Sequence, residues 1–297
     1  MMLRARWLLL AVAPLLVLTI FVATPTPKPA DQQAAGQSES QGAAKRAEEE
    51  LESAEDLLAK MPPGLAAPDK KELAHQILGS AMNSTKDWRT LYGHIADSDD
   101  GDGYCGGVIG FCSGTKDMLV LVESYTKEHP DNGLAEYVTA LRAVNGTDSH
   151  EGLGAGFMEA WREESEKPAF RKAQDRVRDT MYFTSAVDLA KLDGLGTLGQ
   201  FIYYDAMVFH GPGIDKNGFY EIRERVRAAH KTKAEGGKEK AYLDAFLDEC
   251  RKVMLEANPD QDTSRIDTTQ RAFLRDGNLT LKTPLVWQMY GQTFRVS

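Results

Sequence analysis

Apolar residues recur at helical spacing through most of the chain beyond residue 67, and this periodicity limits the fold more than any other feature. Leu73, Ile77, Leu78 and Ala81, for example, form one apolar face, and Asp69 is the expected N-cap of that helix. The same spacing predicts further helices over residues 111–125, 134–144, 169–181, 186–209 and 241–255. The pattern therefore predicts a domain built mainly from α-helices.

One stretch, residues 94–110, interrupts the helical pattern. Aspartate and glycine cluster there around Tyr104, and the short apolar pair Val108 and Ile109 follows. This composition is typical of a turn within a small β-hairpin. The expected class is thus mainly α (α+β), with one minor β element.

The N-terminal region has a different composition. Arg4 and Arg6 precede an apolar run over residues 7–23, which indicates an exported segment whose N-terminus stays inside. Because no good small-residue cleavage site follows the run, an uncleaved membrane anchor is favoured over a cleaved signal. Either segment predicts an extracytoplasmic location for the rest of the chain.

A linker is expected between this anchor and the globular domain. Residues 24–42 are rich in Pro, Gln, Ala, Gly and Ser, and such a stretch cannot bury enough apolar surface to order itself. Residues 43–61 are helix formers with a heptad-like seam. Because two heptads are too few to indicate a coiled coil, a surface helix or a stalk is favoured over a dimerising coiled coil. The predicted divisions are residues 1–24 (anchor or signal), 25–66 (linker and short helix) and 67–297 (globular domain).

The net charge of −9 argues against nucleic acid as a partner, because phosphates require patches of Lys and Arg. An acidic protein suits a cationic partner, although many soluble proteins are equally acidic. The three cysteines do not form a disulfide framework, but one bridge is possible in an oxidising compartment.

Neither a CxxC nor an HExxH motif occurs, so no metal or other cofactor is expected. Gly101 stands where an EF-hand needs a ligand, which argues against an EF-hand. The aspartates at positions 97, 99, 100 and 102 crowd one loop and leave a loose calcium site open.

Two walls of a catalytic site can be inferred from the order of these elements. Glycoside hydrolysis commonly needs two carboxyl groups flanking the scissile bond, one as acid and one as base or nucleophile. A helix end facing a β-hairpin is one way to place such a pair. Here the helix ending near Asn83 and the loop bearing Asp100 are the candidate walls.

Several long segments occur in an order and spacing that resemble glycoside hydrolase family 46, the chitosanases. They are residues 83–88 (NSTKDW), 103–115 (GYCGGVIGFCSGT), 117–119 (DML), 152–154 (GLG), 198–206 (LGQFIYYDA), 210–213 (HGPG) and 262–271 (DTSRIDTTQR). The resemblance covers about residue 68 to the C-terminus. It implies a lysozyme-like fold of two mostly helical lobes with a substrate cleft, and inverting endo-hydrolysis of β-1,4-linked glucosamine in chitosan or a similar polysaccharide.

The resemblance also implies roles for four retained residues. Asp100 matches the general base that orients water, and Asp117 matches a carboxylate that binds a substrate ammonium group. Asp205 and Arg265 match a buried charge network behind the catalytic acid. Purely structural roles compete with these, since Asp117 could cap a helix and Asp205 and Arg265 could form a core ion pair.

Five positions depart from the family pattern. Met82 stands where the family has its general-acid glutamate, and methionine has no proton to give. Cys105 stands at the position of the threonine that holds the attacking water, and Asp102 replaces an arginine. Cys250 aligns with an arginine that pairs with the acid, and Ala257 aligns with a substrate-binding glutamate. Losing the arginine with the glutamate avoids an uncompensated buried charge.

Three functions remain in competition. The first is an active or weakened chitosanase in which another carboxyl, Asp205 foremost, replaces the acid. The second is a catalytically silent domain that binds chitosan or a related glycan at the cell surface. The third is a soft-metal site made by Met82, Cys105 and Cys250, since sulfur ligands suit Cu(I).

Overall fold

Helices form most of the structure, a computed structural model in which residues 52–97 and 101–297 are described. The chain divides into two compact units, Met1–Pro63 and Gly64–Ser297. The described part of the first unit is chiefly a helix over residues 52–60. The predicted anchor, residues 7–23, lies outside the described residues. Among the described helices, none is both long and apolar enough to cross a membrane.

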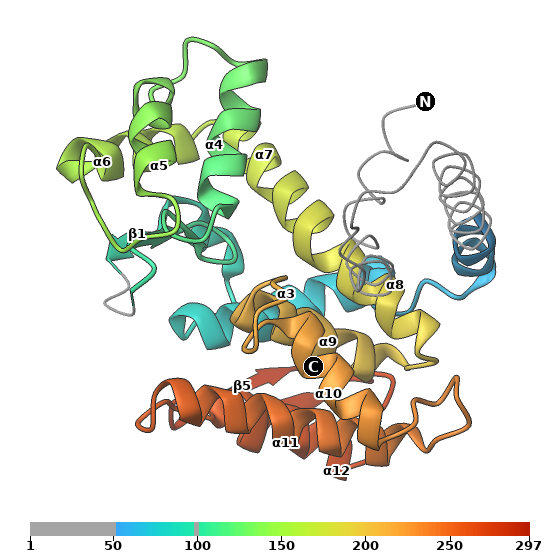
Figure 1. Cartoon of the computed structure of the whole chain (residues 1–297). Coiled ribbons are helices and arrows are strands. Elements are labelled where there is room, and N and C mark those ends of the chain that lie inside the picture. Colours follow the sequence, from blue (N-terminus) through green and yellow to red (C-terminus); the bar gives the residue numbers. More distant parts are fainter. Residues whose placement is uncertain (1–51, 98–100) are drawn as a thin grey trace, which may run out of the picture. The chain divides into compact units, whose positions relative to one another are not determined.

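The second unit contains two groups of elements that α7 (Pro168–Arg178) connects (Figure 1). The first lobe consists of β1 (Ile95–Asp97), β2 (Tyr104–Gly106), β3 (Phe111–Cys112), α4 (Asp117–Glu128), η3 (Ala135–Tyr137), α5 (Val138–Val144) and α6 (Gly154–Ser165). The mainly α fold with a small antiparallel sheet is as predicted.

The second lobe contains the remaining elements. They are η1 (Gly64–Ala66), α3 (Pro68–Asn83), α8 (Thr184–Leu192), α9 (Thr197–His210), α10 (Phe219–Ala229), α11 (Glu239–Ala257), η5 (Arg265–Gln270), α12 (Arg271–Arg275), β4 (Leu285–Met289) and β5 (Gln292–Val296). Two short elements lie at the junction: η2 (Trp88–Gly93) contacts both α3 and α6, and the π-helical turn η4 (Asp179–Phe183) joins α7 to α8.

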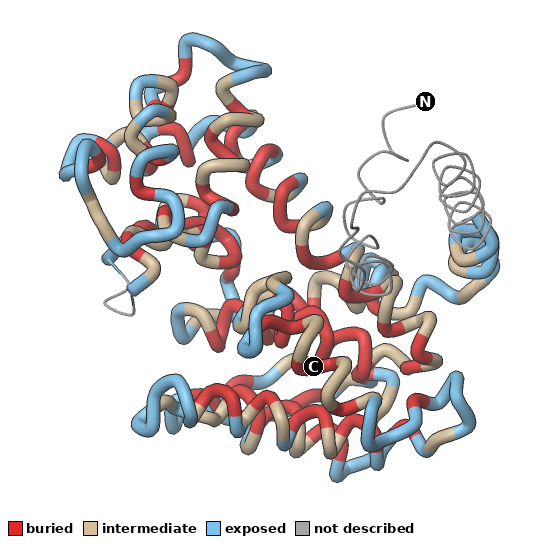
Figure 2. The backbone as a smooth tube through the Cα atoms, viewed as in Figure 1, coloured by how far each residue is buried: buried red, intermediate tan, exposed pale blue. Residues whose placement is uncertain are grey.

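Helix α9 forms the centre of the second lobe. Residues 198–207 are all buried, so this helix is enclosed by its neighbours on every side (Figure 2). It contacts α3, α8, α10 and η4. A helix surrounded in this way positions any polar side chain it carries, because such a group must find a partner within the protein.

Two small sheets complete the fold. In the first, β2 pairs with β1 and β3, and Cys105 lies directly opposite Cys112. In the second, β4 and β5 form a hairpin whose two-residue turn, Tyr290 and Gly291, has positive φ at both positions. That conformation is typical of a type I′ turn, which matches the twist of paired strands.

Three local predictions need correction. Residues 111–116 are not helical, because Phe111 and Cys112 pair with β2 before α4 begins at Asp117. The predicted helix over residues 186–209 is two helices, broken near Gly194, which has φ +77°. Asp69 lies within the first turn of α3 and Ala67 is the N-cap. Residues 108 and 109 lie in the turn between β2 and β3, within the hairpin expected there.

Candidate functional site

The residues singled out from the sequence lie in two places. Met82, Cys105 and Asp117 surround the β2–β3 hairpin, at the end of α3, in β2 and at the start of α4. Asp205 and Arg265 meet in the second lobe, on α9 and η5. Asp100, the predicted general base, lies outside the described residues, as does Asp99 of the suggested calcium site. The predicted roles of these residues stay predictions.

The side chain of Met82 faces the turn of the hairpin. Its terminal methyl carbon lies so close to Gly110 that a β-carbon placed there would be 2.7 Å away. Gly110 also has φ +70°, a backbone conformation that favours glycine. The end of α3 and the hairpin turn therefore meet through an apolar thioether, which neither donates a proton nor carries a charge.

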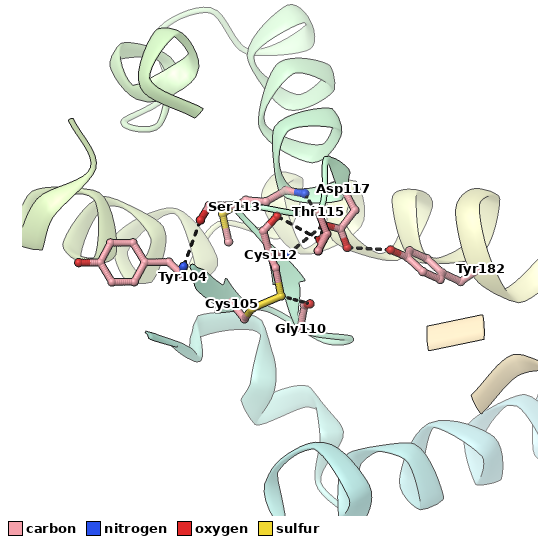
Figure 3. The surroundings of a disulfide bond; sticks show 9 residues. Tyr104, Cys105, Gly110, Cys112, Ser113, Thr115, Asp117 and Tyr182 are labelled. Carbon is pink, nitrogen blue, oxygen red and sulfur yellow. Dashed lines mark hydrogen bonds between the residues drawn. A yellow bond between two sulfur atoms is a disulfide. The ribbon is translucent and has the colours of Figure 1, made fainter. Parts of the chain in front are cut away.

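Cys105 and Cys112 form a disulfide between the two paired strands β2 and β3 (Figure 3). The Cys112 sulfur lies 3.1 Å from the carbonyl oxygen of Gly110. This sulfur has no proton, so the contact is not a donated hydrogen bond. Cys105 accordingly has no hydroxyl or thiol with which to hold a water molecule.

The disulfide overturns the proposed soft-metal site. Cys105 is bonded to Cys112, while Cys250 is a free cysteine buried on α11 beside Asp205 and Arg265. Within residues 52–97 and 101–297, no group of three or more His, Cys, Asp or Glu side chains is arranged to hold a metal ion.

Asp117 is held by hydrogen bonds on both of its carboxylate oxygens (Figure 3). Oδ1 accepts the N–H groups of Cys112 and Met118, at 3.0 and 2.8 Å, and the hydroxyl of Thr115 at 2.8 Å. Oδ2 accepts the Tyr182 hydroxyl at 2.7 Å. Asp117 is only 3% exposed. Burial raises the pKa of Asp117 to about 6 against the opposing effect of these hydrogen bonds.

Through these hydrogen bonds Asp117 connects the β2–β3 hairpin to α4. It is the first residue of α4, where the helix dipole favours a negative charge. Its bond to Tyr182 also reaches η4, the turn that follows α7. The predicted contact between Asp117 and a substrate ammonium group stays a prediction.

Asp205 and Arg265 form a loosely bonded pair. The Nε of Arg265 lies 3.6 Å from Oδ2 of Asp205, and it has no hydrogen-bond partner in the described part of the chain. The same Oδ2 accepts a hydrogen bond from the amide of Gln270 at 2.6 Å. The Arg265 guanidinium lies 4.5 Å from the centre of the Phe209 ring. Burial raises the pKa of Asp205, and the positive charge of Arg265 and the Gln270 bond oppose that rise.

A small cavity adjoins this pair, with a volume of about 10 Å³, which is room for one water molecule. Its walls include Asp205, Cys250, Arg265 and His210. Burial raises the pKa of the Cys250 thiol, so it stays protonated and unreactive. Burial and the charge of Arg265 lower the pKa of His210 to about 3, so this ring is neutral. Neither Cys250 nor His210 is therefore poised to exchange a proton near neutral pH.

Two further positions at which the sequence departs from the family pattern, Ala257 and Asp102, lie elsewhere. Ala257, where the resemblance implies a substrate-binding glutamate, is the exposed last residue of α11 and offers only a methyl group. The backbone carbonyl of Asp102 accepts a hydrogen bond from Gly114 at 2.9 Å, which helps to close the hairpin.

Sequence reasoning missed the part played by the β4–β5 hairpin. The Trp287 indole donates to the Ser80 hydroxyl at 2.9 Å, and the Tyr290 hydroxyl donates to the Ala81 carbonyl at 2.7 Å. The N–H of Tyr290 donates to the Ser264 hydroxyl at 3.0 Å. The hairpin thus fixes the end of α3, directly before Met82, to the residue directly before Arg265. Gly291 was the available signal, as the second residue of a tight turn.

Comparisons with known proteins identify relatives that cover most of the chain. The sequence model of glycosyl hydrolase family 46 matches residues 76–285. A chitosanase from Streptomyces sp. (strain N174) is 50% identical over 234 residues, which is 79% of this chain and 84% of that protein.

Solved structures of chitosanases are also similar. Chitosanase OU01 with substrate has a TM-score of 0.78 and 47% identity, covering 80% of this chain and all of that one. A glutamate-to-alanine mutant of the Bacillus subtilis MY002 chitosanase, in complex with six glucosamine units, has a TM-score of 0.72 and 29% identity. That alignment covers 78% of this chain and 99% of the mutant.

Proposed function

Because this chain belongs to glycosyl hydrolase family 46, we propose that it binds chitosan or a similar glucosamine-rich polysaccharide, and that it does so without cleaving it. The observation that carries the proposal is the chemistry at the end of α3. Met82 presents an apolar methyl group to the hairpin, and the sequence resemblance implies that this is the position of the family's general acid. General acid–base groups typically contribute about 10²- to 10⁴-fold to rate, so a site without its acid is expected to turn over little or no substrate.

A second change in the same place supports the proposal. Cys105, at the position of the water-orienting threonine, is bonded to Cys112 and cannot donate a hydrogen bond to water. Two groups that would act directly on the reacting atoms are therefore replaced by groups without that chemistry.

Glycan binding does not depend on every glutamate of such a protein. The Bacillus subtilis MY002 chitosanase in which one glutamate is replaced by alanine is found in complex with six glucosamine units. This relative supports a binding function for a chain that lacks a family glutamate. We expect Asp117, which is retained, to contribute to the attraction for the cationic polymer, as the net charge of −9 does.

Hydrolysis with a substitute acid is the second candidate, and one observation favours it. Burial raises the pKa of Asp205, as a proton donor requires. However, Asp205 is only 3% exposed, and Arg265 and Gln270 both interact with its Oδ2. Proton donation needs direct contact with the glycosidic oxygen, which a carboxyl enclosed in this way is poorly placed to make. The charge of a buried carboxylate such as Asp117, by contrast, can attract a cationic polymer without contact, so we favour binding without turnover.

An extracytoplasmic location is part of the proposal. The apolar run over residues 7–23 would export the domain, and residues 24–66 would separate it from the membrane. The Cys105–Cys112 disulfide supports this placement, because disulfides persist mainly in oxidising compartments.

Calorimetric titration with a glucosamine hexamer, followed by assay of new reducing ends in the same sample, tests the proposed function. We expect saturable binding and no new reducing ends, with weaker binding of the fully N-acetylated hexamer, which lacks ammonium groups. Steady release of reducing ends that Asp205→Asn abolishes would instead establish hydrolysis with a substitute acid.

A further inference from the structure

The Cys105–Cys112 disulfide closes the segment that contacts Met82. The two cysteines are opposite one another in β2 and β3, and the turn between them contains Gly110, against which the Met82 methyl packs. Strand β3 has only two residues, and its pairing with β2 involves only two positions. Strands this short are marginal without further support, so the disulfide adds a covalent cross-link to the burial of Phe111 and the backbone hydrogen bonds that hold β3 in place.

Strand β3 in turn supports the carboxylate of Asp117. The backbone N–H of Cys112 donates to Asp117 Oδ1 at 3.0 Å. Thr115 bridges the same two residues, since its hydroxyl lies 3.4 Å from the Cys112 carbonyl and 2.8 Å from Asp117 Oδ1. Movement of Cys112 would therefore change the orientation of Asp117, although Met118 and Tyr182 would still bond to it.

Both cysteines are partly exposed, so a thiol reductant has access to the bond. The third cysteine, Cys250, is buried and unpaired. Within the described residues, a change produced by mild reduction can thus be assigned to the Cys105–Cys112 bond.

We propose that the Cys105–Cys112 disulfide is a redox-sensitive positioning element of the glycan site: it fixes β3, and through it Asp117 and the turn that Met82 contacts. Reduction by a dithiol transfers two electrons and two protons to the disulfide. It leaves the Cys105 and Cys112 thiols and an oxidised, cyclic form of the dithiol. The reduced protein keeps its fold but holds Asp117 less rigidly, so it binds glucosamine oligomers more weakly. This inference rests on the proposed glycan-binding function.

The test is titration of the purified full-length protein with a glucosamine hexamer, before and after treatment with dithiothreitol. A mass increase of two hydrogens and labelling of two new thiols verify the reduction. We expect the affinity to fall about tenfold, with the helical circular dichroism unchanged. Reoxidation should restore the original affinity.

Two variants show which thiols are responsible. The double variant Cys105→Ser/Cys112→Ser should bind like the reduced protein and ignore dithiothreitol. Cys250→Ala, whatever its own affinity, should keep the tenfold ratio between the oxidised and reduced states.

Equal affinity before and after verified reduction would overturn the inference while leaving the proposed function intact. Loss of binding together with loss of helical signal would also overturn it, since the disulfide would then serve folding alone. Absence of hexamer binding by the oxidised protein would overturn the proposed function itself, and the inference with it.

Discussion

The β2–β3 hairpin and the pocket around Asp205 differ in how completely their charged groups are bonded. At the hairpin, Asp117 accepts four hydrogen bonds and a disulfide cross-links the strands beside it. At the pocket, Asp205 accepts one short hydrogen bond and lies 3.6 Å from an arginine nitrogen that has no hydrogen-bond partner among the described residues. A cavity of about 10 Å³ adjoins that pair.

This difference matches the two tasks of a glycoside hydrolase. Groups that hold a glycan have to be fixed in position whether or not the glycan is cleaved. A charge network behind a general acid is needed only while the acid is present. In the function we propose, Met82 and Cys250 stand at the positions of the acid and its arginine, so the network would be loose because it no longer supports a glutamate.

The substitution Cys250→Arg should give the largest effect on stability, because it places a charge directly in the loosely bonded pocket around Asp205. It would bury a second guanidinium beside Arg265 with only Asp205 to compensate, at a cost on the order of 3 kcal/mol in the free energy of unfolding. Adding Met82→Glu should recover part of this loss. Urea denaturation of both single variants and the double variant measures the coupling.

A matched control separates charge from size in that experiment. Cys250→Met introduces a long but uncharged side chain at the same buried position, and should cost less than Cys250→Arg. If Cys250→Arg were tolerated and Met82→Glu added nothing to it, the two positions would be independent and the account of a jointly lost network would be wrong.

Removing the disulfide tests the tightly bonded side. The double variant Cys105→Ser/Cys112→Ser opens a loop that the bond closes over a sequence separation of 7 residues. Loop entropy then predicts a loss of about 2 to 3 kcal/mol in unfolding free energy. Cys250→Ala, which only enlarges an existing cavity slightly, should cost about 1 kcal/mol. A larger stability loss in Cys250→Ala than in the double variant would contradict the contrast between the β2–β3 hairpin and the pocket around Asp205.

The pKa of Asp117 predicts how glycan affinity depends on pH. Because burial raises this pKa to about 6, the carboxylate is charged above pH 6 and neutral below it. Affinity for a glucosamine hexamer should therefore fall by up to about tenfold per pH unit as the pH drops from 6 towards 4.

Protein stability should respond to Asp117 in the opposite direction. A carboxyl with a raised pKa in the folded state contributes most to stability at low pH, and that contribution is lost as the pH rises through 6.

Comparison with Asp117→Asn in calorimetric titrations isolates the effect of Asp117 on glycan affinity, since the variant should lose the fall in affinity at acidic pH. If Asp117→Asn kept the same fall in affinity at acidic pH, that fall would belong to another titrating group.

The smallest effect is expected at the link between the two sides. Tyr290→Phe removes the hydrogen bond to the Ala81 carbonyl while keeping the ring, and should lower unfolding stability by about 1 kcal/mol. Thermal unfolding measures this loss. An effect of several kcal/mol would mean that the β4–β5 hairpin supports α3 more strongly than the side-chain hydrogen bonds of Trp287 and Tyr290 to that helix indicate.

Sequence reasoning predicted the class of the fold because helical periodicity survives in almost every segment of the domain. The flanking residues keep the family pattern, and for that reason the sequence singles out Met82 and Cys105 as departures; their status as departures stays a prediction. It did not find that Cys105 pairs with Cys112, because strand register and not spacing brings these residues together.

Other features were missed for similar physical reasons. Strand β4 (LVWQM) buries alternate residues, but the outward-facing Val286 is apolar and obscures the alternation. The break between α8 and α9 depends on the positive φ of Gly194, which apolar periodicity does not reveal. The contact of Met82 with Gly110 joins residues 28 positions apart, as a consequence of how α3 meets the hairpin.

The most direct test of binding without turnover is a side-by-side assay of reducing-end release from chitosan by the unmodified protein and by Met82→Glu/Cys105→Thr/Cys250→Arg. We predict no release by the unmodified protein. The triple variant should show cleavage at least about 10²-fold above it, because the acid, its arginine and the water-orienting hydroxyl return together. Cleavage by the unmodified protein, or an inert triple variant that still binds the glucosamine hexamer, would contradict the account.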